Sequence, residues 1–144
     1  MLIRKLETRD VSWVAQMEKE NFSMPWSESA FTDTLSQEEA LFLVAEEEGQ
    51  GLGYIGIYLS FEEGEITNVS VDKGQRNRGI GNALVDQLKK EAKARKIEKI
   101  FLEVRASNEP AIHLYEKQGF EKVGCRKNFY ERPREDAWVM MCSL

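Results

Sequence analysis

The feature that most constrains the fold is a glycine-containing turn between a strand-like run and a helix-like run. The strand-like run is Ile66–Val71, and Ile80–Ala94 has the apolar spacing of an amphipathic helix. The turn between them contains Arg76, Gly79 and Gly81. A helix N-terminus leaves backbone N–H groups unpaired, and glycine lets a ligand approach the backbone closely. The pattern therefore predicts a site for a phosphorylated ligand.

Two other phosphate-binding motifs compete with this turn. A Walker A loop needs Gly-Lys followed by Ser or Thr, and the sequence contains no such tripeptide. A dinucleotide fingerprint, G-x-G-x-x-G, is matched by Gly51, Gly53 and Gly56. These glycines lead into the strand-like run 54–58, whereas the fingerprint must open a helix. We therefore interpret them as hairpin glycines.

Composition narrows the class of protein. The 144 residues are 42% hydrophobic and 31% charged, which is typical of one soluble globular domain spanning residues 1–144. The net charge of −5 argues against a nucleic-acid binder and is compatible with a basic peptide partner. No apolar run approaches the ~20 residues that span a bilayer. The N-terminus lacks a signal-peptide core, so we expect a cytoplasmic protein without a membrane partner.

Metal and disulfide chemistry have little support in the sequence. His113 is the lone histidine and is expected on a helix surface, so no histidine-based metal site is predicted. Cys125 and Cys142 are the two cysteines. They would face each other if the last two strands formed a symmetric hairpin, and a bulge would break that register. In a reducing compartment we expect two free thiols.

The order of expected elements is β-α-α-β-β-β-α-β-α-β-β, which indicates an α/β domain built on a mixed sheet. Ser27 is expected to cap the second helix and Asn108 the last one, and Gly119 is expected to end the last helix. The expected strands are residues 2–6, 41–45, 53–60, 66–71, 99–105, 120–130 and 136–143.

Several motifs together resemble the GNAT acetyltransferases. The acetyl-coenzyme A (acetyl-CoA) signature is matched by Val69–Asp72 followed by Arg76-x-x-Gly79-x-Gly81. The downstream matches are Leu102–Asn108, Leu114–Glu116 and Gly119-Phe120. The chain also resembles one branch, the bacterial ribosomal-protein-alanine N-acetyltransferases, nearly end to end. The stretches specific to that branch are Pro25–Glu28, Leu102–Asn108, Arg126–Tyr130 and Arg134–Ala137.

The resemblance implies a fold and a set of ligand-binding residues. The fold is the GNAT fold, a mixed and mostly antiparallel sheet of about seven strands flanked by about four helices. In the family, backbone N–H groups of the turn hold the pyrophosphate of acetyl-CoA, and a splayed strand binds the pantetheine arm. By analogy, the Val69 N–H would act as an oxyanion donor. The residues implied are Val69, Ser70, Val71, Arg76, Asn77, Arg78, Gly79, Ile80, Gly81, Asn82 and Asn108.

Glu103 is the candidate general base for acetyl transfer to an amine. It lies in the apolar run Ile100–Val104, where partial desolvation would raise its carboxyl pKa toward neutrality. The alternative is an outward-facing carboxylate paired with a lysine or arginine. The resemblance favours the base, because the corresponding glutamate has that role in the family.

Tyr115 is the candidate general acid toward the departing thiolate. A tyrosine hydroxyl, with a pKa of about 10, can protonate a thiolate as it leaves. The alternative is a core tyrosine packed beside Ile112 on an amphipathic helix. The resemblance favours the acid, and direct attack in a ternary complex is expected because neither cysteine matches a nucleophile motif.

The pKa of the amine bears on the substrate. A protein α-amine has a pKa of about 7.7–8.0 and a lysine about 10.4, so the lysine needs ~3 kcal/mol more help to lose its proton. This favours an α-amine. With the resemblance, it predicts acetylation of the N-terminal alanine of a small-subunit ribosomal protein through a basic N-terminal peptide. Tyr130, Glu131 and Arg132 are expected to border the peptide, and Trp26 is expected either there or in the core.

Two rival functions remain open at the level of sequence. One is a GNAT enzyme that acts on a lysine or a small-molecule amine. The other is a non-catalytic acetyl-CoA binder, which the presence of both Glu103 and Tyr115 disfavours.

Overall fold

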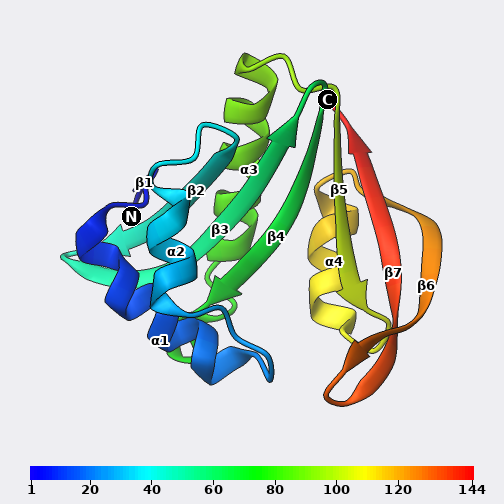
Figure 1. Cartoon of the computed structure of the whole chain (residues 1–144), viewed down its shortest axis with the longest axis horizontal. Helices are drawn as coiled ribbons and strands as arrows, with labels where there is room; N and C mark the ends of the chain where they lie inside the picture. Colours follow the sequence, from blue (N-terminus) through cyan, green and yellow to red (C-terminus); the bar gives the residue numbers. More distant parts are fainter.

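The computed structural model describes residues 1–144 as a seven-stranded sheet with helices on both faces (Figure 1). The strand order is β1-β2-β3-β4-β5-β7-β6, and β4–β5 is the parallel pair among antiparallel neighbours. The strands are β1 Leu2–Lys5, β2 Ala40–Glu47, β3 Gln50–Ser60, β4 Glu63–Val71, β5 Lys99–Arg105, β6 Glu121–Glu131 and β7 Arg134–Ser143. The α-helices are α1 Val11–Asn21, α2 Glu28–Thr34, α3 Ile80–Ala94 and α4 Glu109–Lys117. The predicted fold class is confirmed.

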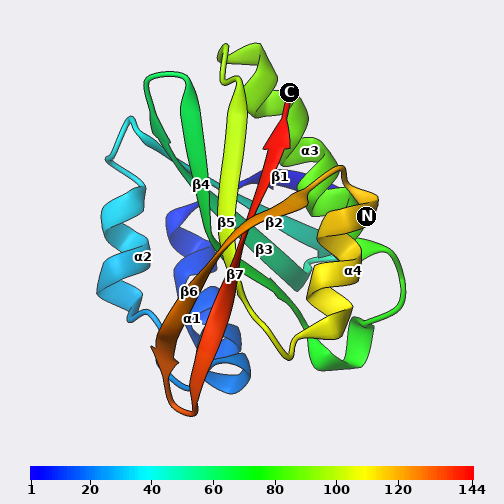
Figure 2. The same cartoon turned by 90° about the vertical axis from the view of Figure 1, so that its right-hand side faces the viewer.

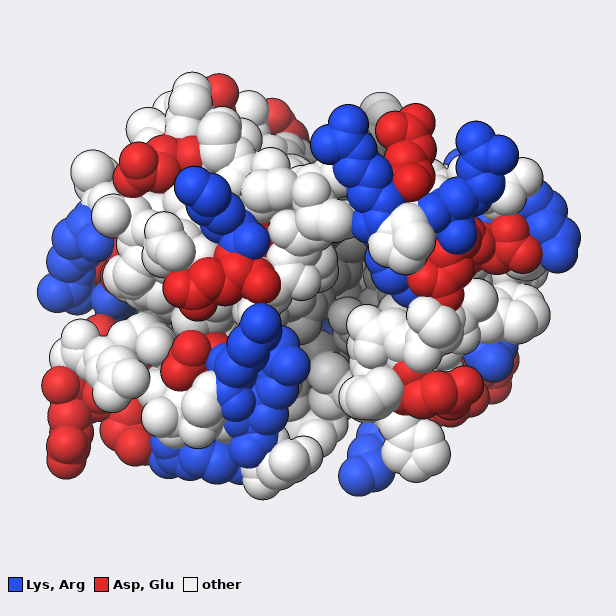
Figure 3. All heavy atoms as spheres, turned by 90° about the horizontal axis from the view of Figure 1, so that it is seen from below, with Lys and Arg blue, Asp and Glu red and all other residues white.

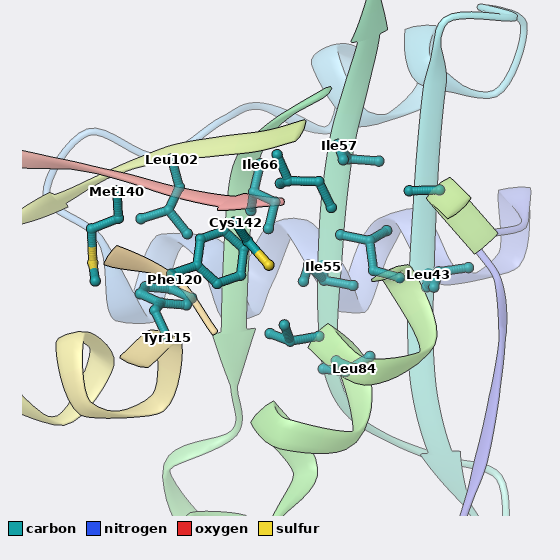
Figure 4. Close-up of a cluster of buried hydrophobic side chains, with 14 of the residues drawn as sticks. Leu43, Ile55, Ile57, Ile66, Leu84, Leu102, Tyr115, Phe120, Met140 and Cys142 are labelled. Atoms are coloured by element: carbon teal, nitrogen blue, oxygen red, sulfur yellow. The ribbon is translucent and has the colours of Figure 1, made fainter. Parts of the chain in front are cut away.

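The helices divide between the two faces of the sheet. Figure 2 shows α2 on one side of the strands and α3 and α4 on the other. Side chains of α3 and α4 pack with strand residues in the larger core, which has 21 buried residues in all. Part of this core is drawn in Figure 4. A second core of eight buried residues lies beneath α1 and α2. None of the helices is long and apolar enough to cross a membrane.

The helix boundaries follow from local chemistry. The Ser27 hydroxyl accepts a hydrogen bond from the Ala30 N–H at 3.1 Å, and Asn108 Oδ1 accepts one from the Ala111 N–H at 3.3 Å. These are N-caps, which satisfy N–H groups that a helix start leaves unpaired. Gly119 follows α4 with φ +91°, a left-handed conformation that favours glycine. The predicted caps and the predicted end of α4 are confirmed.

The sheet opens between β4 and β5. The two strands pair only from Glu63–Lys99 to Ile66–Leu102. Beyond that point β4 stays with β3 and β5 stays with β7, and Figure 1 shows the two parts of the sheet diverging. A bulge in the β3–β4 register at Gly56/Ile57 accompanies the divergence, and bulges increase local twist. The facing edges of β4 and β5 are therefore free of ladder hydrogen bonds along the opening.

The last hairpin differs from a symmetric one. Register shifts occur at Lys122/Gly124 and at Arg126/Tyr130. Cys125 consequently lies opposite Trp138, while Cys142 pairs with Ile100 and is buried, so the two thiols do not face each other. The seventh strand begins at Arg134, two residues earlier than expected, because the ladder extends to the pair Glu131–Arg134.

A buried carboxylate joins α1 to the sheet on the α1–α2 face. Glu18 is 3% exposed and accepts a hydrogen bond from the Tyr54 hydroxyl at 2.6 Å. It also accepts from the Trp26 N–H at 3.1 Å and from Asn68 Nδ2 at 3.4 Å. No lysine or arginine pairs with it, so these donors alone balance the cost of burying its charge. They tie α1, the α1–α2 loop, β3 and β4 together.

Candidate functional site

The predicted phosphate-binding turn has free backbone donors. The N–H groups from Arg76 to Asn82 donate to no backbone oxygen. The first backbone hydrogen bond of the helix runs from the Ala83 N–H to the Gly79 carbonyl oxygen at 3.0 Å. Gly79 has φ +79° and Asn77 has φ +68°. A Cβ added at Gly79 would meet nothing within 4 Å, so the backbone is open to a ligand there. Free N–H groups at an exposed helix start fit the pyrophosphate of acetyl-CoA.

Gly81 serves packing as well as access. A Cβ placed there would come within 3.2 Å of Leu114 Cδ2 on α4. The start of α3 and the middle of α4 therefore approach each other more closely than a larger residue would allow. The turn and the helix that carries Tyr115 are held together at this contact.

The two arginines of the turn differ in their surroundings. Arg78 forms an ion pair with Glu47 on β2 at 3.0 Å and donates a hydrogen bond to Gln75. Arg76 is exposed and has no ion pair. Only Arg76 therefore brings an unpaired positive charge to the turn.

The predicted pantetheine-binding residues lie on the part of β4 that has left β5. Val69 and Val71 are half-buried against the larger core on the α3 face. Ser70 is buried on the opposite face, where its hydroxyl is hydrogen-bonded to Asn21 Nδ2. The strand thus offers its backbone edge to the opening while its side chains pack to either side.

Glu103 is half-buried on β5, opposite Val139 of β7, and forms no ion pair and no hydrogen bond with a donor group. The lysine or arginine partner that the alternative interpretation expected is therefore absent. Burial raises the pKa of the Glu103 carboxyl, and the nearby Glu65 carboxylate raises it further. Arg126 acts in the opposite direction. A carboxyl with a raised pKa next to the opening has the properties of a general base near neutral pH.

Tyr115 lies on α4 within the larger core, 7% exposed, with its ring 5.8 Å from that of Phe120 (Figure 4). The packing that the alternative interpretation expected is therefore present. Burial raises the pKa of the Tyr115 hydroxyl, which keeps it protonated over the physiological range. A buried, protonated hydroxyl without a hydrogen-bond partner is compatible with proton donation as well.

Tyr130 lies beside the candidate base. Burial and the negative charge of Glu103 raise the pKa of Tyr130 to about 12. The guanidinium of Arg105 stacks on the Tyr130 ring, 4.3 Å from its centroid. Tyr130 was expected near the peptide, and the structure brings it close to Glu103. Trp26, in contrast, packs against Phe31 at 5.3 Å in the second core.

Three charged neighbours of the site were missed from the sequence: Glu65, Arg105 and Arg126. Glu65 is one of 25 acidic residues, and only the β4–β5 register, Glu65 opposite Phe101, places it near Glu103. Arg126 reaches the site through the irregular register of β6. Arg105 carried a signal, since it lies two residues after Glu103 and side chains two apart share a face of a strand.

Figure 3 shows the molecule from the open end of the sheet. A hollow separates two lobes, and lysine, arginine, aspartate and glutamate side chains are scattered over both. No group of histidine, cysteine, aspartate and glutamate residues is arranged to hold a metal ion. His113 is exposed on α4 as expected.

Comparison with known proteins agrees with this geometry. The model of the Acetyltransferase (GNAT) family matches residues 11–120. A putative [ribosomal protein bS18]-alanine N-acetyltransferase from Bacillus subtilis is 32% identical over 143 residues, covering 99% of this chain and 95% of the relative. The crystal structure of the ribosomal-protein-S18-alanine N-acetyltransferase from Escherichia coli is 33% identical, with a TM-score of 0.90, covering 99% of this chain and 92% of that one.

A further solved structure, Ard1 from Thermoplasma volcanium, is 25% identical with a TM-score of 0.91 and covers 99% of this chain and 97% of that one. The family match spans most of the chain and includes the turn, the opening and both candidate catalytic residues. The chain belongs to the GNAT acetyltransferase family.

Proposed function

We propose that this protein transfers the acetyl group of acetyl-CoA to the N-terminal α-amine of a protein, namely the N-terminal alanine of ribosomal protein bS18. The observation that carries the proposal is the identity of 32–33% to bS18-alanine N-acetyltransferases across 94–95% of their length. The basic N-terminal peptide of such a substrate would suit a chain of net charge −5. The compartment that fits a ribosomal substrate is the cytoplasm.

Acetyl-CoA would be held by the turn and by β4. The N–H groups of Asn77, Arg78, Gly79, Ile80, Gly81 and Asn82 would bind the pyrophosphate, and Arg76 would add an unpaired positive charge. The free edge of β4 at Val69, Ser70 and Val71 would hold the pantetheine arm by its backbone. The Val69 N–H would donate to the thioester carbonyl oxygen as charge develops on it. Asn108 would contact the arm while it caps α4.

The chemical steps use two side chains. Glu103 takes a proton from the substrate ammonium, directly or through water, and the neutral nitrogen attacks the thioester carbonyl carbon. The new C–N bond forms, the C–S bond breaks, and the thiolate takes the proton of the Tyr115 hydroxyl. The amide nitrogen releases its second proton to solvent, and Tyr115 regains a proton from solvent. Both substrates are bound at once, so no acyl-enzyme forms.

The state of Glu103 favours an α-amine over a lysine. An α-amine with a pKa of about 7.7–8.0 lies closer to a carboxyl with a raised pKa than a lysine of about 10.4 does. Proton transfer from an α-ammonium to Glu103 therefore has to overcome a smaller difference in pKa than transfer from a lysine. It needs ~3 kcal/mol less assistance from the site.

Four synthetic peptides test the proposal. Three begin with Ala, Ser or Met and share one basic tail, and the fourth has a blocked N-terminus and a single internal lysine. Incubation with acetyl-CoA, followed by mass-spectrometric mapping of the acetyl group, should show fastest modification of the Ala peptide at its α-amine. Acetylation of the blocked peptide alone would establish the lysine alternative. Acetyl-CoA binding without transfer to any peptide or small amine would establish the non-catalytic one.

A further inference from the structure

The turn between β6 and β7 is held from both sides of the opening. From the β5 side, Arg105 Nη1 donates to the Pro133 carbonyl at 2.9 Å and Nη2 donates to the Arg132 carbonyl at 3.1 Å. From the other side, the Ser23 hydroxyl in the α1–α2 loop donates to the same Arg132 carbonyl. One carbonyl oxygen thus receives donors from the two diverging parts of the molecule. The turn spans the open end of the sheet on the α1–α2 face.

Arg105 is itself fixed in place. Its Nη1 lies 3.2 Å from Glu135 Oε1, and Glu135 Oε2 accepts the Ser107 N–H at 2.6 Å. The arginine, the carboxylate and the β5–α4 loop therefore form one connected set of contacts. About three quarters of the Arg105 side chain is withdrawn from solvent. This is a more constrained arrangement than an exposed ion pair, whose members are free to separate.

The same guanidinium also sets the position of Tyr130. Its carbon lies 4.3 Å from the centroid of the Tyr130 ring. Glu103 and Arg105 are two residues apart on β5 and share a face, so their Cα atoms are separated by ~7 Å. Burial and the negative charge of Glu103 together raise the pKa of Tyr130. Arg105 therefore connects the turn, the tyrosine ring and the strand that carries the candidate base.

We propose that Arg105 is a positioning residue for the amine substrate. It holds Tyr130 and the β6–β7 turn in place beside Glu103, where they border the amine. The inference rests on the proposed function in taking the amine to enter on the α1–α2 face. Lysine would not replace the arginine, because an ammonium lacks the planar fork that serves two carbonyls and a carboxylate while stacking on a ring. Acetyl-CoA binding, at the α3 turn, should not depend on Arg105.

The test compares Arg105→Lys with Arg95→Lys, a control at an exposed arginine that forms no side-chain hydrogen bond or ion pair. Arg105→Lys should raise the KM for the peptide about tenfold or more, since small displacements of positioning groups are costly to turnover. The dissociation constant for acetyl-CoA, measured by calorimetry, should stay within about twofold of the wild type, as should every constant of the control. A peptide KM that does not change, or an equal loss of acetyl-CoA binding, would overturn the proposal.

A double-mutant cycle separates positioning from a general loss of structure. Tyr130→Leu should raise the peptide KM on its own, and Arg105→Lys should add little in that background, because the two groups act as a unit. Strictly additive effects would contradict the proposed coupling. Hydrogen exchange of the turn amides, which should become faster in Arg105→Lys and remain unchanged in Arg95→Lys, gives a readout independent of turnover. Unchanged exchange would also contradict it.

The failure of the proposed function would look different. If the wild-type protein acetylates a lysine or a small amine and leaves the Ala peptide unmodified, N-terminal acetylation is wrong. The same variants are then compared with the amine that is used. Arg105→Lys should still raise its KM and accelerate exchange at the turn, and equal behaviour of the two lysine variants would overturn the role of Arg105.

Discussion

The guanidinium of Arg78 lies 3.0 Å from the carboxylate of Glu47, so the predicted phosphate-binding turn is joined to β2 by an ion pair. The neighbouring Arg76 has no such partner. Two arginines that look equivalent in the sequence would therefore meet a bound phosphate with different net charges around them.

Arg76→Ala is expected to weaken acetyl-CoA binding more than Arg78→Ala. The loss of an unpaired charge near a pyrophosphate is worth about 1 kcal/mol at an exposed helix start, which corresponds to about fivefold in KM. The charge of Arg78 is already balanced by Glu47, so its removal should change the KM by less than about twofold. Steady-state kinetics at low salt measures both values, and the difference should shrink as salt is added. Equal effects would show that Arg78 leaves Glu47 when the ligand binds.

Glu65→Gln should move the acid limb of the pH–rate profile to lower pH. The base must be ionised to act, so kcat/KM rises with pH through the pKa of Glu103. The negative charge of Glu65 helps to raise that pKa, and removing the charge lowers it. The profile of kcat/KM against pH measures the shift. Glu63→Gln, at an exposed neighbour on the same strand, is the matched control.

Arg126→Gln should shift the same limb in the opposite direction. Arg126 lowers the pKa of Glu103, so its neutralisation raises that pKa and moves the limb to higher pH. The pair of variants therefore brackets the wild-type profile. A limb that moves in the same direction in both would mean that a group other than Glu103 controls it.

Tyr115→Phe should separate catalysis from stability. The hydroxyl has no hydrogen-bond partner in the protein, and the ring packs against Phe120, so phenylalanine should keep the packing. The free energy of unfolding should change by less than about 1 kcal/mol, whereas kcat should fall by about 10²–10⁴ if the hydroxyl is the general acid. Denaturant unfolding and single-turnover kinetics measure the two quantities. Full activity would remove Tyr115 from the mechanism.

Asp10 lies far from the candidate site, and Asp10→Asn should lower the stability of the protein. Asp10 is buried, and burial alone would raise its carboxyl pKa; hydrogen bonds from Arg4, the Glu7 N–H and Trp13 outweigh burial and lower it. A carboxyl whose pKa is lowered in the folded state stabilises the protein above its unfolded pKa of about 3.9, and that stability is lost as the pH falls below it.

Breaking the largely buried ion pair between Asp10 and Arg4 should lower the free energy of unfolding by about 3 kcal/mol at pH 7, measured by urea unfolding. The difference between wild type and variant should narrow in acid. Asp33→Asn, at an exposed position on α2, should change the stability by less than about 0.5 kcal/mol. A difference that grows in acid would contradict the assignment.

Local chemistry explains what could be predicted from the sequence. The apolar spacing and the glycine turn placed α3 at Ile80–Ala94, and a short apolar run placed β5 at Lys99–Arg105, both with the bounds that the structure has. Asn108 could be recognised as a cap because its amide acts within its own turn. These features depend on neighbours a few residues away, which is where sequence patterns are informative.

The remaining features depend on register and could not be predicted in the same way. Glu65 meets Glu103 only because β4 and β5 pair in parallel for four residues, and no local pattern specifies that pairing. The irregular β6–β7 ladder decides which face Arg126 and Cys125 occupy, since one extra residue reverses every side chain beyond it. For Trp26 the sequence left two positions open, the border of the peptide site and the core. An aromatic residue suits both, and the structure places it against the second core.

The carboxylate of Glu18 has a consequence for the motions of the molecule. If α1 swung outward, the Tyr54 hydroxyl and the Asn68 amide would lose their shared acceptor at the same moment, and Trp26 would lose its anchor. Detachment of this helix is therefore an all-or-none event with a high free-energy cost, not a gradual fraying. The α1 side of the opening is therefore rigid, and the β6–β7 turn, which Ser23 ties to the α1–α2 loop, rests against a fixed support.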